Sequence, residues 1–131
     1  MRILLDTQCW LWMAAAPEKL SAPALSLVQT TDNELFLSAA SAWEIGIKYA
    51  LKKLPLPEPP EQYVPTRLER LRTSPLPIDI PHALRVAGLP PHHRDPFDRL
   101  LVAQAQHEGL PILTADAVFH KYDVEVIMAR S

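Results

Sequence analysis

Four acidic residues stand at positions where alternating strands and helices bring side chains together. Asp6 ends the first predicted strand, and Glu44 opens the helix predicted after the second strand. Asp98 lies in the first turn of a later helix, and Asp116 follows the strand predicted at LPILT. Because the carboxyl ends of parallel strands meet at one edge of a sheet, we expect these carboxylates to converge there.

A shared cluster of carboxylates needs a counter-charge. Like charges within a few ångströms raise each other's pKa and strain the fold, and a divalent cation removes that repulsion. Carboxylate oxygens with few histidines suit Mg²⁺ or Mn²⁺ better than zinc. Such a cation is commonly held by one or two carboxylates together with substrate phosphate, which points to phosphoryl chemistry.

The same acids also have purely structural interpretations. Asp6 and Asp116 fit helix N-caps, because aspartate accepts hydrogen bonds from free backbone N–H groups there. Ser41 and Glu44 fit a capping box, and Glu44 precedes Lys48 by four residues, the spacing of a surface ion pair on a helix. The residue types alone leave both interpretations open.

The stretch RDPFDRLL, residues 94–101, contains two aspartates with different expected roles. Asp95 precedes Pro96, the residue type favoured at the first helical position, so Asp95 is predicted to be the N-cap. At about 100° per residue, Asp98 falls on the apolar stripe of the helix, between Ala105 and Val102. A carboxylate directed towards a core is costly unless it is paired, protonated or metal-bound. We therefore expect Asp98, and not Asp95, to point into a site.

The pattern of acidic residues does not assign a role to several other reactive or charged side chains. His92 and His93 fit metal ligands, proton shuttles or solvated loop residues. Lys48 and Arg99 lie beside the predicted acids and fit either phosphate contacts or ion pairs with those acids. Cys9 lies among aromatic and aliphatic residues, which favours a buried small side chain over a nucleophile. With 3 glycines in all, the chain has no glycine-rich phosphate loop.

The composition is that of an ordinary globular chain. Its 131 residues fit one domain, and the 48% hydrophobic and 21% charged residues argue against disorder or a fibre. The net charge of -2 gives no basic footprint for tight, metal-free binding of nucleic acid. A single cysteine excludes an internal disulfide, and we expect a cytoplasmic protein. Asp6 interrupts the apolar N-terminal run, and no run reaches about 18 apolar residues, so neither a signal peptide nor a membrane span is predicted.

The hydrophobic pattern predicts strands that alternate with helices. The expected strands cover residues 2–6, 34–40, 76–79, 110–116 and 122–128. The expected helices cover residues 9–16, 21–29, 41–53, 61–73, 82–89 and 94–109, the last with Gly109 at its stop. A proline-rich loop is expected at residues 54–65. This order is typical of an α/β domain with a central, mostly parallel β-sheet flanked by helices.

Four segments of the chain resemble a known family. LLDTQCWLW, SAASAWEIGIK, HRDPFDRLLVAQA and LTAD occur in the order and approximate spacing of PIN-domain proteins. The chain is most similar to the VapC toxins of bacterial type II toxin–antitoxin pairs, over nearly its whole length. The resemblance implies a PIN-like fold in a single domain over residues 1–131. It also implies an endoribonuclease, dependent on Mg²⁺ or Mn²⁺, that cuts RNA phosphodiesters.

The resemblance also assigns roles to residues. It makes four acids catalytic, namely Asp6, Glu44, Asp98 and Asp116. The metal would be held mainly through Asp6 and Asp98, and the other two acids would orient water or help to deprotonate the nucleophile.

Three further positions take a meaning from the resemblance. Thr7 and Thr114 match hydroxyl residues beside the first and last acids, which orient those acids by hydrogen bonds. Gln8 departs from the pattern, because this subgroup often has histidine there, and the role of the position stays open.

The resemblance further implies partners. VapC toxins generally form homodimers, and a cognate antitoxin inhibits them with a segment that reaches the active site. Trp10, Trp12 and Trp43 either line an apolar groove for such a segment or lie in the core.

Two other functions are compatible with the residues. The chain fits a non-catalytic protein-binding module if the acids serve only as caps. It also fits a PIN-like nuclease acting on another nucleic acid, although it lacks the length for extra elements that grip DNA.

Overall fold

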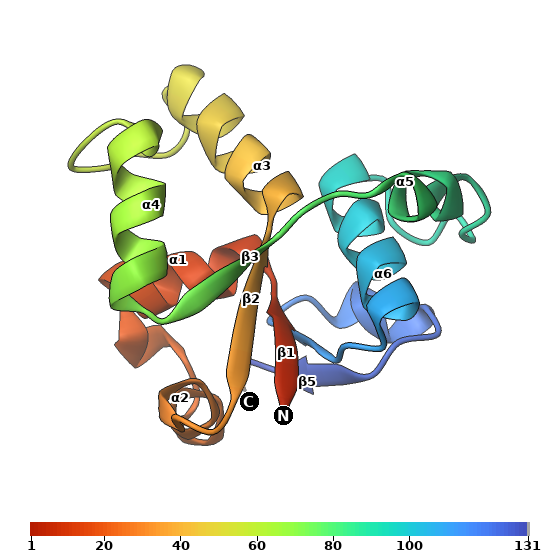
Figure 1. Cartoon of the computed structure of the whole chain (residues 1–131), viewed down its shortest axis with the longest axis horizontal. Helices are drawn as coiled ribbons and strands as arrows, with labels where there is room; N and C mark the ends of the chain where they lie inside the picture. Colours follow the sequence, from red (N-terminus) through yellow and green to blue (C-terminus); the bar gives the residue numbers. More distant parts are fainter. Residues whose placement is uncertain (131) are drawn as a thin grey trace.

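The fold is built on one parallel sheet, and the computed structural model describes residues 1–130. Five strands pair in the order β3-β2-β1-β4-β5, and every pair is parallel (Figure 1). The strands are β1 (Arg2–Leu5), β2 (Glu34–Ser38), β3 (Thr73–Leu76), β4 (Ile112–Thr114) and β5 (Val126–Met128). The expected α/β class with a mostly parallel sheet is confirmed. The chain builds outward from β1 to β3 and then returns to β4, so the strand order reverses beside β1, where ligands commonly bind in such sheets.

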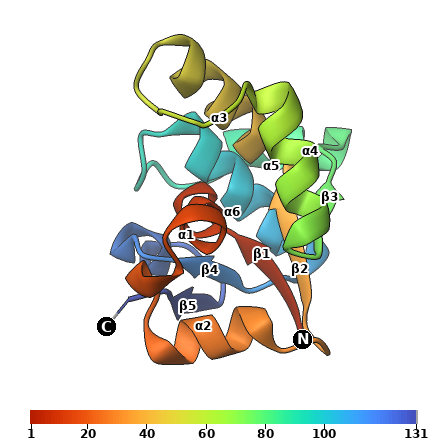
Figure 2. The same cartoon turned by 90° about the vertical axis from the view of Figure 1, so that its left-hand side faces the viewer.

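Helices cover both faces of the sheet. They are α1 (Thr7–Ala15), α2 (Ala22–Gln29), α3 (Ala39–Ala50), α4 (Pro60–Arg70), α5 (Ile80–Ala87) and α6 (Pro96–Glu108), with short 3-10 turns at Pro17–Lys19 and Ala117–Lys121. Figure 1 shows α1, α2 and α4 on one side of the sheet and α5 and α6 on the other. The view in Figure 2 shows α2 below the strands and α3 at the opposite end. Within residues 1–130, no helix has both the length and the apolar character needed to cross a membrane.

The central residues of β1 and β2 are apolar because both faces of these strands are buried. In β1, Ile3 and Leu5 belong to one core cluster and Leu4 to the other, and all three are fully buried. Successive side chains of a strand point to opposite faces, so a continuous apolar run serves two cores at once. This requirement explains why the short apolar runs predicted β1, β2, β4 and β5, whereas the strand predicted at residues 76–79 is displaced from β3.

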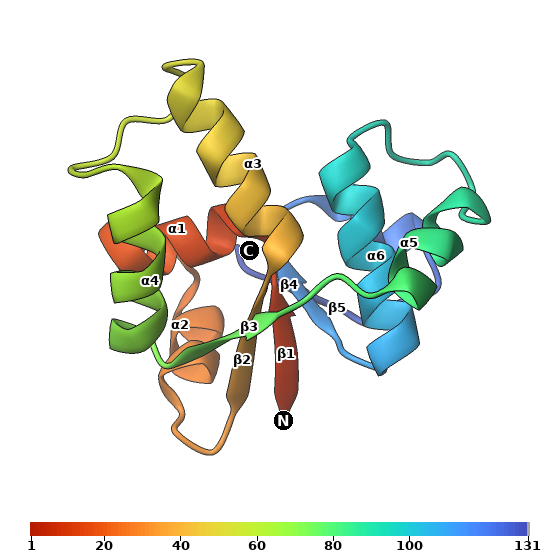
Figure 3. The ribbon, with the colours of Figure 1, turned by 45° about the horizontal axis from the view of Figure 1, so that its top comes forward.

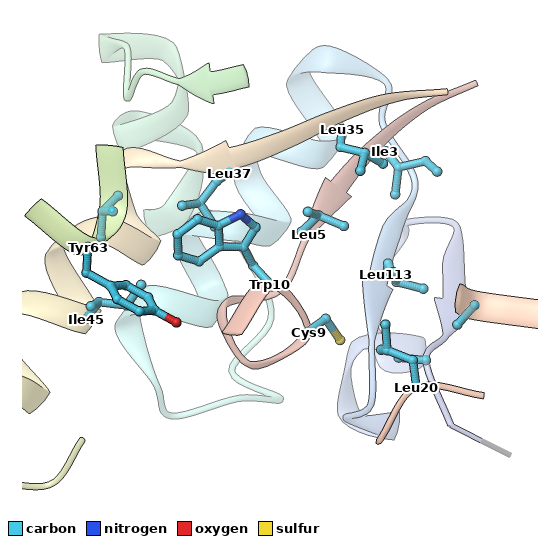
Figure 4. Close-up of a cluster of buried hydrophobic side chains, with 13 residues drawn as sticks. Ile3, Leu5, Cys9, Trp10, Leu20, Leu35, Leu37, Ile45, Tyr63 and Leu113 are labelled. Carbon is cyan, nitrogen blue, oxygen red and sulfur yellow. The ribbon is translucent and has the colours of Figure 1, made fainter. Parts of the chain in front are cut away.

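Trp10 lies in the centre of the larger core cluster (Figure 4). Its side chain is fully buried, its ring meets Tyr63 edge-on at 6.3 Å, and its Nε1–H donates to Thr73 Oγ1 at 3.2 Å. Trp43 is instead 61% exposed on α3. The three tryptophans therefore do not form one groove, because Trp10 is a core residue.

The start of α3 differs from the expected capping box. The helix begins at Ala39, and Ser38 is its N-cap, with its hydroxyl accepting from the Ala40 N–H at 3.0 Å. Ser41 lies inside the helix, so the predicted capping box between Ser41 and Glu44 is wrong. The strand β2 ends earlier than expected, at residue 38, and this moves the cap from the second serine to the first.

Three elements in the middle of the chain also have shifted boundaries. The strand expected at residues 76–79 lies at Thr73–Leu76, where Leu76 pairs in register with Ser38 of β2. The Asp79 N–H donates to His82 Nδ1 at 2.9 Å and so starts α5 two residues before the expected position. The helix expected to reach residue 73 ends at Arg70, because Arg72 adopts a left-handed conformation with φ 51°.

Two glycines are expected to respond oppositely to alanine. Gly109 ends α6 in the left-handed conformation, with φ 68°, as its position as a helix stop predicts. Gly109→Ala is expected to lower the free energy of unfolding by about 1 kcal/mol through backbone strain. Gly46 lies inside α3, and an added Cβ would meet nothing within 4 Å, so Gly46→Ala is expected to stabilise by up to about 1 kcal/mol. Urea unfolding of both variants measures the two effects, and a loss of stability in both would contradict the expectation.

Candidate functional site

A cavity of about 560 Å³ opens at the carboxyl edge of the sheet, where the strand order reverses. Figure 3 shows α3 and α6 rising on either side of the edge where β1 ends. All of the acids singled out in the sequence line this cavity, namely Asp6, Glu44, Asp98 and Asp116, and Asp95 also reaches its wall. The structure therefore brings together side chains from four separate segments of the chain.

Asp6 follows β1 and precedes α1. Its extended backbone, with φ -64° and ψ 147°, places it at the N-cap position, but its side chain makes no capping hydrogen bond. The carboxylate is instead directed to Thr114, whose Oγ1–H donates to Asp6 Oδ2 at 2.7 Å. Burial raises the pKa of Asp6, and the negative charge of Glu44 raises it further, although the Thr114 hydrogen bond opposes both. The interpretation of Asp6 as a capping side chain is therefore wrong.

Glu44 lies within α3 and is only 5% exposed. Its Oε2 accepts from Lys48 Nζ at 2.6 Å, which confirms the predicted pair, although only the lysine is at the surface. This hydrogen bond raises the pKa of Lys48. Glu44 Oε1 is buried and has no hydrogen-bond partner among the described residues. A buried carboxylate oxygen without a donor is costly, so this atom leaves a place for a cation or for water.

Asp95 and Asp98 have the different roles that the helical pattern predicts. Asp95 is the N-cap of α6, and its Oδ1 accepts from the Phe97 N–H at 2.8 Å. The Asp98 side chain lies one turn further on, is 15% exposed and faces the cavity. Burial, followed by the negative charge of Asp6 and of the other neighbouring acids, raises the pKa of Asp98 to about 8. The fold without a bound cation therefore favours the neutral form of this carboxyl group.

Asp116 is a helix cap, as the structural interpretation proposed. Its Oδ1 accepts from the Val118 N–H at 2.9 Å at the start of a 3-10 turn. Its side chain is 41% exposed, which makes Asp116 the most solvent-exposed of the four acids. Capping occupies only Oδ1, and the other oxygen, Oδ2, lies 3.1 Å from His93 Nε2.

The two threonines have different roles. Thr114 Oγ1 donates to Asp6 and accepts from the Asp116 N–H at 3.0 Å, so one hydroxyl links two of the acids. The Thr7 hydroxyl donates to Ser41 Oγ at 2.8 Å. Thr7 thus ties α1 to α3 and does not orient an acid, contrary to the expectation.

His93 is a residue of this site that the sequence did not distinguish from His92. His93 Nε2 lies 2.9 Å from Asp98 Oδ2 and 3.1 Å from Asp116 Oδ2. His92 is exposed and packs edge-on against the ring of Tyr122 at 5.1 Å. Two adjacent loop histidines give no periodic signal, so only the folded loop decides which of them faces the acids.

Arg99 does not belong to the site. Its guanidinium donates to three backbone carbonyls at and after the end of α5, those of Val86, Leu89 and Pro90, at 2.9, 3.3 and 3.1 Å. Arginine near a helix C-terminus satisfies carbonyls that lack a helical partner. The expected ion pair with Asp95 or contact with phosphate is therefore replaced by a structural role.

The remaining candidates are placed as follows. Cys9 is fully buried, and burial raises the pKa of its thiol to about 12, so it is a core residue and not a nucleophile. Gln8 is exposed and lines the cavity.

The donor set fits a hard divalent cation. The cavity offers carboxylate oxygens from several segments, one of them buried without a partner, and repulsion among the acids contributes to the raised pKa of Asp98. His93, Asp98 and Asp116 each also place a potential ligand atom within 4.8 Å of the others. A cation among oxygen ligands would remove both the repulsion and the unpaired oxygen.

Comparison with known proteins agrees with the fold. A ribonuclease of Mycobacterium tuberculosis named VapC16 is 52% identical over 67 residues, which are 50% of this chain and 48% of that protein. The alignment therefore spans about half the length of this curated relative. The solved structure of VapBC2 from Rickettsia felis, bound to a DNA fragment from its promoter, matches with a TM-score of 0.74 at 15% identity and covers 98% of both chains. VapBC-5 from M. tuberculosis, a member of the VapBC family of toxin-antitoxin systems, matches with a TM-score of 0.61 at 20% identity, covering 99% of this chain and 98% of that one.

The family of this chain is shown by a family model, independently of the short alignment to VapC16 and of the distant structural similarities. The family model described as the PIN domain matches residues 3–125, which is most of the chain and includes all four acids of the cavity. The chain therefore belongs to the PIN domain family.

Proposed function

We propose that this chain is an endoribonuclease dependent on Mg²⁺ or Mn²⁺, and the toxin of a VapBC-type pair. The convergence of four acids on one cavity, with Glu44 Oε1 buried and unpaired, is the observation that carries this proposal. Membership of the PIN domain family supports it, and so does the name of the curated relative, a ribonuclease, which aligns over about half of its length. We further propose that residues 1–131 form a single PIN domain that acts in the cytoplasm.

Asp6 and Asp98 are the residues proposed to hold the metal. Both line the cavity, and neither side chain makes a helix-capping hydrogen bond. Asp98 lies in the first turn of α6, where a cation gains nothing from the helix dipole, so its affinity must come from the carboxylates. When bound, such a cation neutralises the charge that develops on a phosphodiester and acidifies water.

The other two acids are proposed to act on water. The Glu44 Oε1 atom can accept a hydrogen from water, while Lys48 holds Oε2 in place. Asp116 is the most open of the four and reaches water at the cavity edge. Both can orient a nucleophile or take a proton from it. Oxygen ligands of this kind suit Mg²⁺ and Mn²⁺.

The proposed partners are RNA, a cognate antitoxin and a second copy of the chain. Structural neighbours that are VapBC assemblies support the antitoxin. Because the net charge is -2, RNA is proposed to bind through the metal and not through a basic surface.

Asp6→Asn is expected to reduce RNA cleavage at least about 100-fold, because a metal site that loses one carboxylate loses both affinity and alignment. Purified protein is incubated with total bacterial RNA in Mg²⁺, in Mn²⁺ and in EDTA, and cleavage is followed on gels. Asp32→Asn is the matched control, since Asp32 is exposed in a turn and does not line the cavity. A folded Asp6→Asn protein that cleaves at the wild-type rate would overturn the proposal, as would wild-type cleavage that persists in EDTA.

A further inference from the structure

His93 makes three contacts with the loop before α6 and the segment after β4, two of them through its imidazole ring. The His93 backbone N–H donates to the Tyr122 hydroxyl oxygen at 2.8 Å, and the Asp95 backbone N–H donates to His93 Nδ1 at 3.2 Å. Phe119 meets the ring at 5.9 Å. Phe119 is fully buried and Tyr122 is 5% exposed, so these contacts are anchored in the core. The position of the ring is therefore set by packing and not by the acids that it faces.

These contacts also select the tautomer of His93. A neutral imidazole carries one hydrogen, and a nitrogen that accepts a hydrogen bond cannot carry it. Because Nδ1 accepts from the Asp95 N–H, the hydrogen lies on Nε2. Nε2 is then a donor towards Asp116 Oδ2 at 3.1 Å, with Asp98 Oδ2 at 2.9 Å beside it. A nitrogen that donates to a carboxylate is not free to bind a cation.

The Asp116 carboxylate is consequently held at both oxygens. Val118 N–H donates to Oδ1 at 2.9 Å, and His93 Nε2 contacts Oδ2 at 3.1 Å. Two donors fix the plane of a carboxylate, while each oxygen keeps a lone pair that can accept from water. Without His93, Asp116 could turn about its Val118 contact, because its side chain is 41% exposed.

We propose that His93 is a positioning residue that acts through Asp116: its Nε2–H directs the Asp116 carboxylate into the cavity beside Asp98, and His93 itself is not a metal ligand. The inference rests on the proposed function, since the positioned carboxylate serves the cleavage of RNA. His93, Asp98 and Asp116 lie close enough to hold a metal ion together, and the inference excludes His93 from that ligand set.

His93→Ala is expected to lower kcat for RNA cleavage about 10- to 100-fold, the usual loss when the partner of an active-site carboxylate is removed. The KM for RNA and the Kd for Mn²⁺, measured by electron paramagnetic resonance, are expected to change less than about 3-fold. His93→Gln, which can place an amide N–H near the position of Nε2, is expected to recover part of kcat. The matched control is His92→Ala, because the exposed neighbour contacts no acid, and its kcat is expected to stay at the wild-type value.

A double-mutant cycle tests whether His93 acts through Asp116. Adding His93→Ala to Asp116→Asn is expected to cause little further loss of kcat, since the positioned group is already changed. Adding His93→Ala to Glu44→Gln is expected to give the product of the two separate losses. Losses that multiply in both cycles would overturn the inference, and so would a rise of ten-fold or more in the Mn²⁺ Kd of His93→Ala.

Nitrogen-15 spectra of the histidine side chains give a readout without RNA. In the metal-free wild type, His93 is expected to carry its hydrogen on Nε2, and Asp116→Asn is expected to shift that nitrogen resonance. A hydrogen on Nδ1 would overturn the inference even if the protein cleaves RNA. If the wild type cleaves no RNA in either metal, the proposed function fails, and the spectra still decide whether His93 holds Asp116.

Discussion

Replacing Asp98 with asparagine is expected to abolish metal-dependent RNA cleavage, whereas the same replacement at Asp95 is expected to leave most of it. The two residues are of the same type and lie at the start of the same helix, yet they have different partners. Asp95 Oδ1 accepts from the Phe97 N–H at 2.8 Å, and asparagine caps a helix about as well as aspartate. Asp98 caps nothing, lies in the cavity and is 2.9 Å from His93 Nε2. Only its change removes a proposed ligand.

The expected sizes of the two effects are far apart. Asp98→Asn is expected to lower kcat/KM at least about 100-fold, and Asp95→Asn about 3-fold or less. Asp95→Asn is also expected to lower the free energy of unfolding by less than about 1 kcal/mol, since it removes a favourable charge at the start of α6. Cleavage of total bacterial RNA in Mg²⁺ and Mn²⁺ measures the rates, after circular dichroism has shown that both variants fold. Equal losses in the two variants would show that the division of roles between these aspartates is wrong.

In the metal-free protein, Asp98→Asn is expected to stabilise the fold, and the gain is expected to grow as pH rises. Burial and neighbouring charges raise the pKa of Asp98 to about 8, against about 3.9 in an unfolded chain. Between these two values the folded protein keeps a proton that the unfolded chain has released. The free energy of unfolding therefore falls with rising pH, by at most about 1.4 kcal/mol per pH unit, and the fall ends above about pH 8. Asparagine has no charge to lose and does not contribute this slope.

From pH 5 to pH 8, the stability gained by Asp98→Asn is expected to grow by about 2–4 kcal/mol. This is less than the maximum slope of about 1.4 kcal/mol per pH unit would give, because water that enters the site partly solvates the charged carboxylate. Thermal unfolding in EDTA across this range measures it, and Asp32→Asn is expected to follow the wild-type curve. Saturating Mn²⁺ is expected to reverse the order, since a ligand at 100 times its Kd stabilises the wild type by about 2.7 kcal/mol. A difference that stays constant with pH would show that Asp98 is not buried among like charges.

The activity and the stability of this site are thus expected to oppose each other. Asp6 and Asp98 both have a raised pKa because they are buried near other acids. Glu44 adds a buried oxygen without a partner. Each feature costs stability in the metal-free protein and is relieved by a cation, so the same substitutions are expected to stabilise the fold and remove the function.

Local patterns in the sequence determined the α/β class with a mostly parallel sheet and the different roles of the two aspartates. Apolar runs within residues 2–6 and 34–40 predicted buried parallel strands, because a strand covered on both faces buries successive apolar side chains. Pro96 after Asp95 predicted the cap, and the helical period predicted the inward direction of Asp98. These signals span one turn or one strand, so a single sequence contains them.

The tertiary structure decided every feature that depends on two distant segments. The predicted cap of α3 was Ser41, but β2 ends at Ser38 and the cap is Ser38 instead. Thr114 reaches Asp6 across 108 positions of the chain, whereas Thr7 turns to α3. His93, and not His92, faces the acids because the core holds it there. Such contacts are set by how elements pack, and a hydrogen-bonding side chain has many possible partners until packing removes all but one.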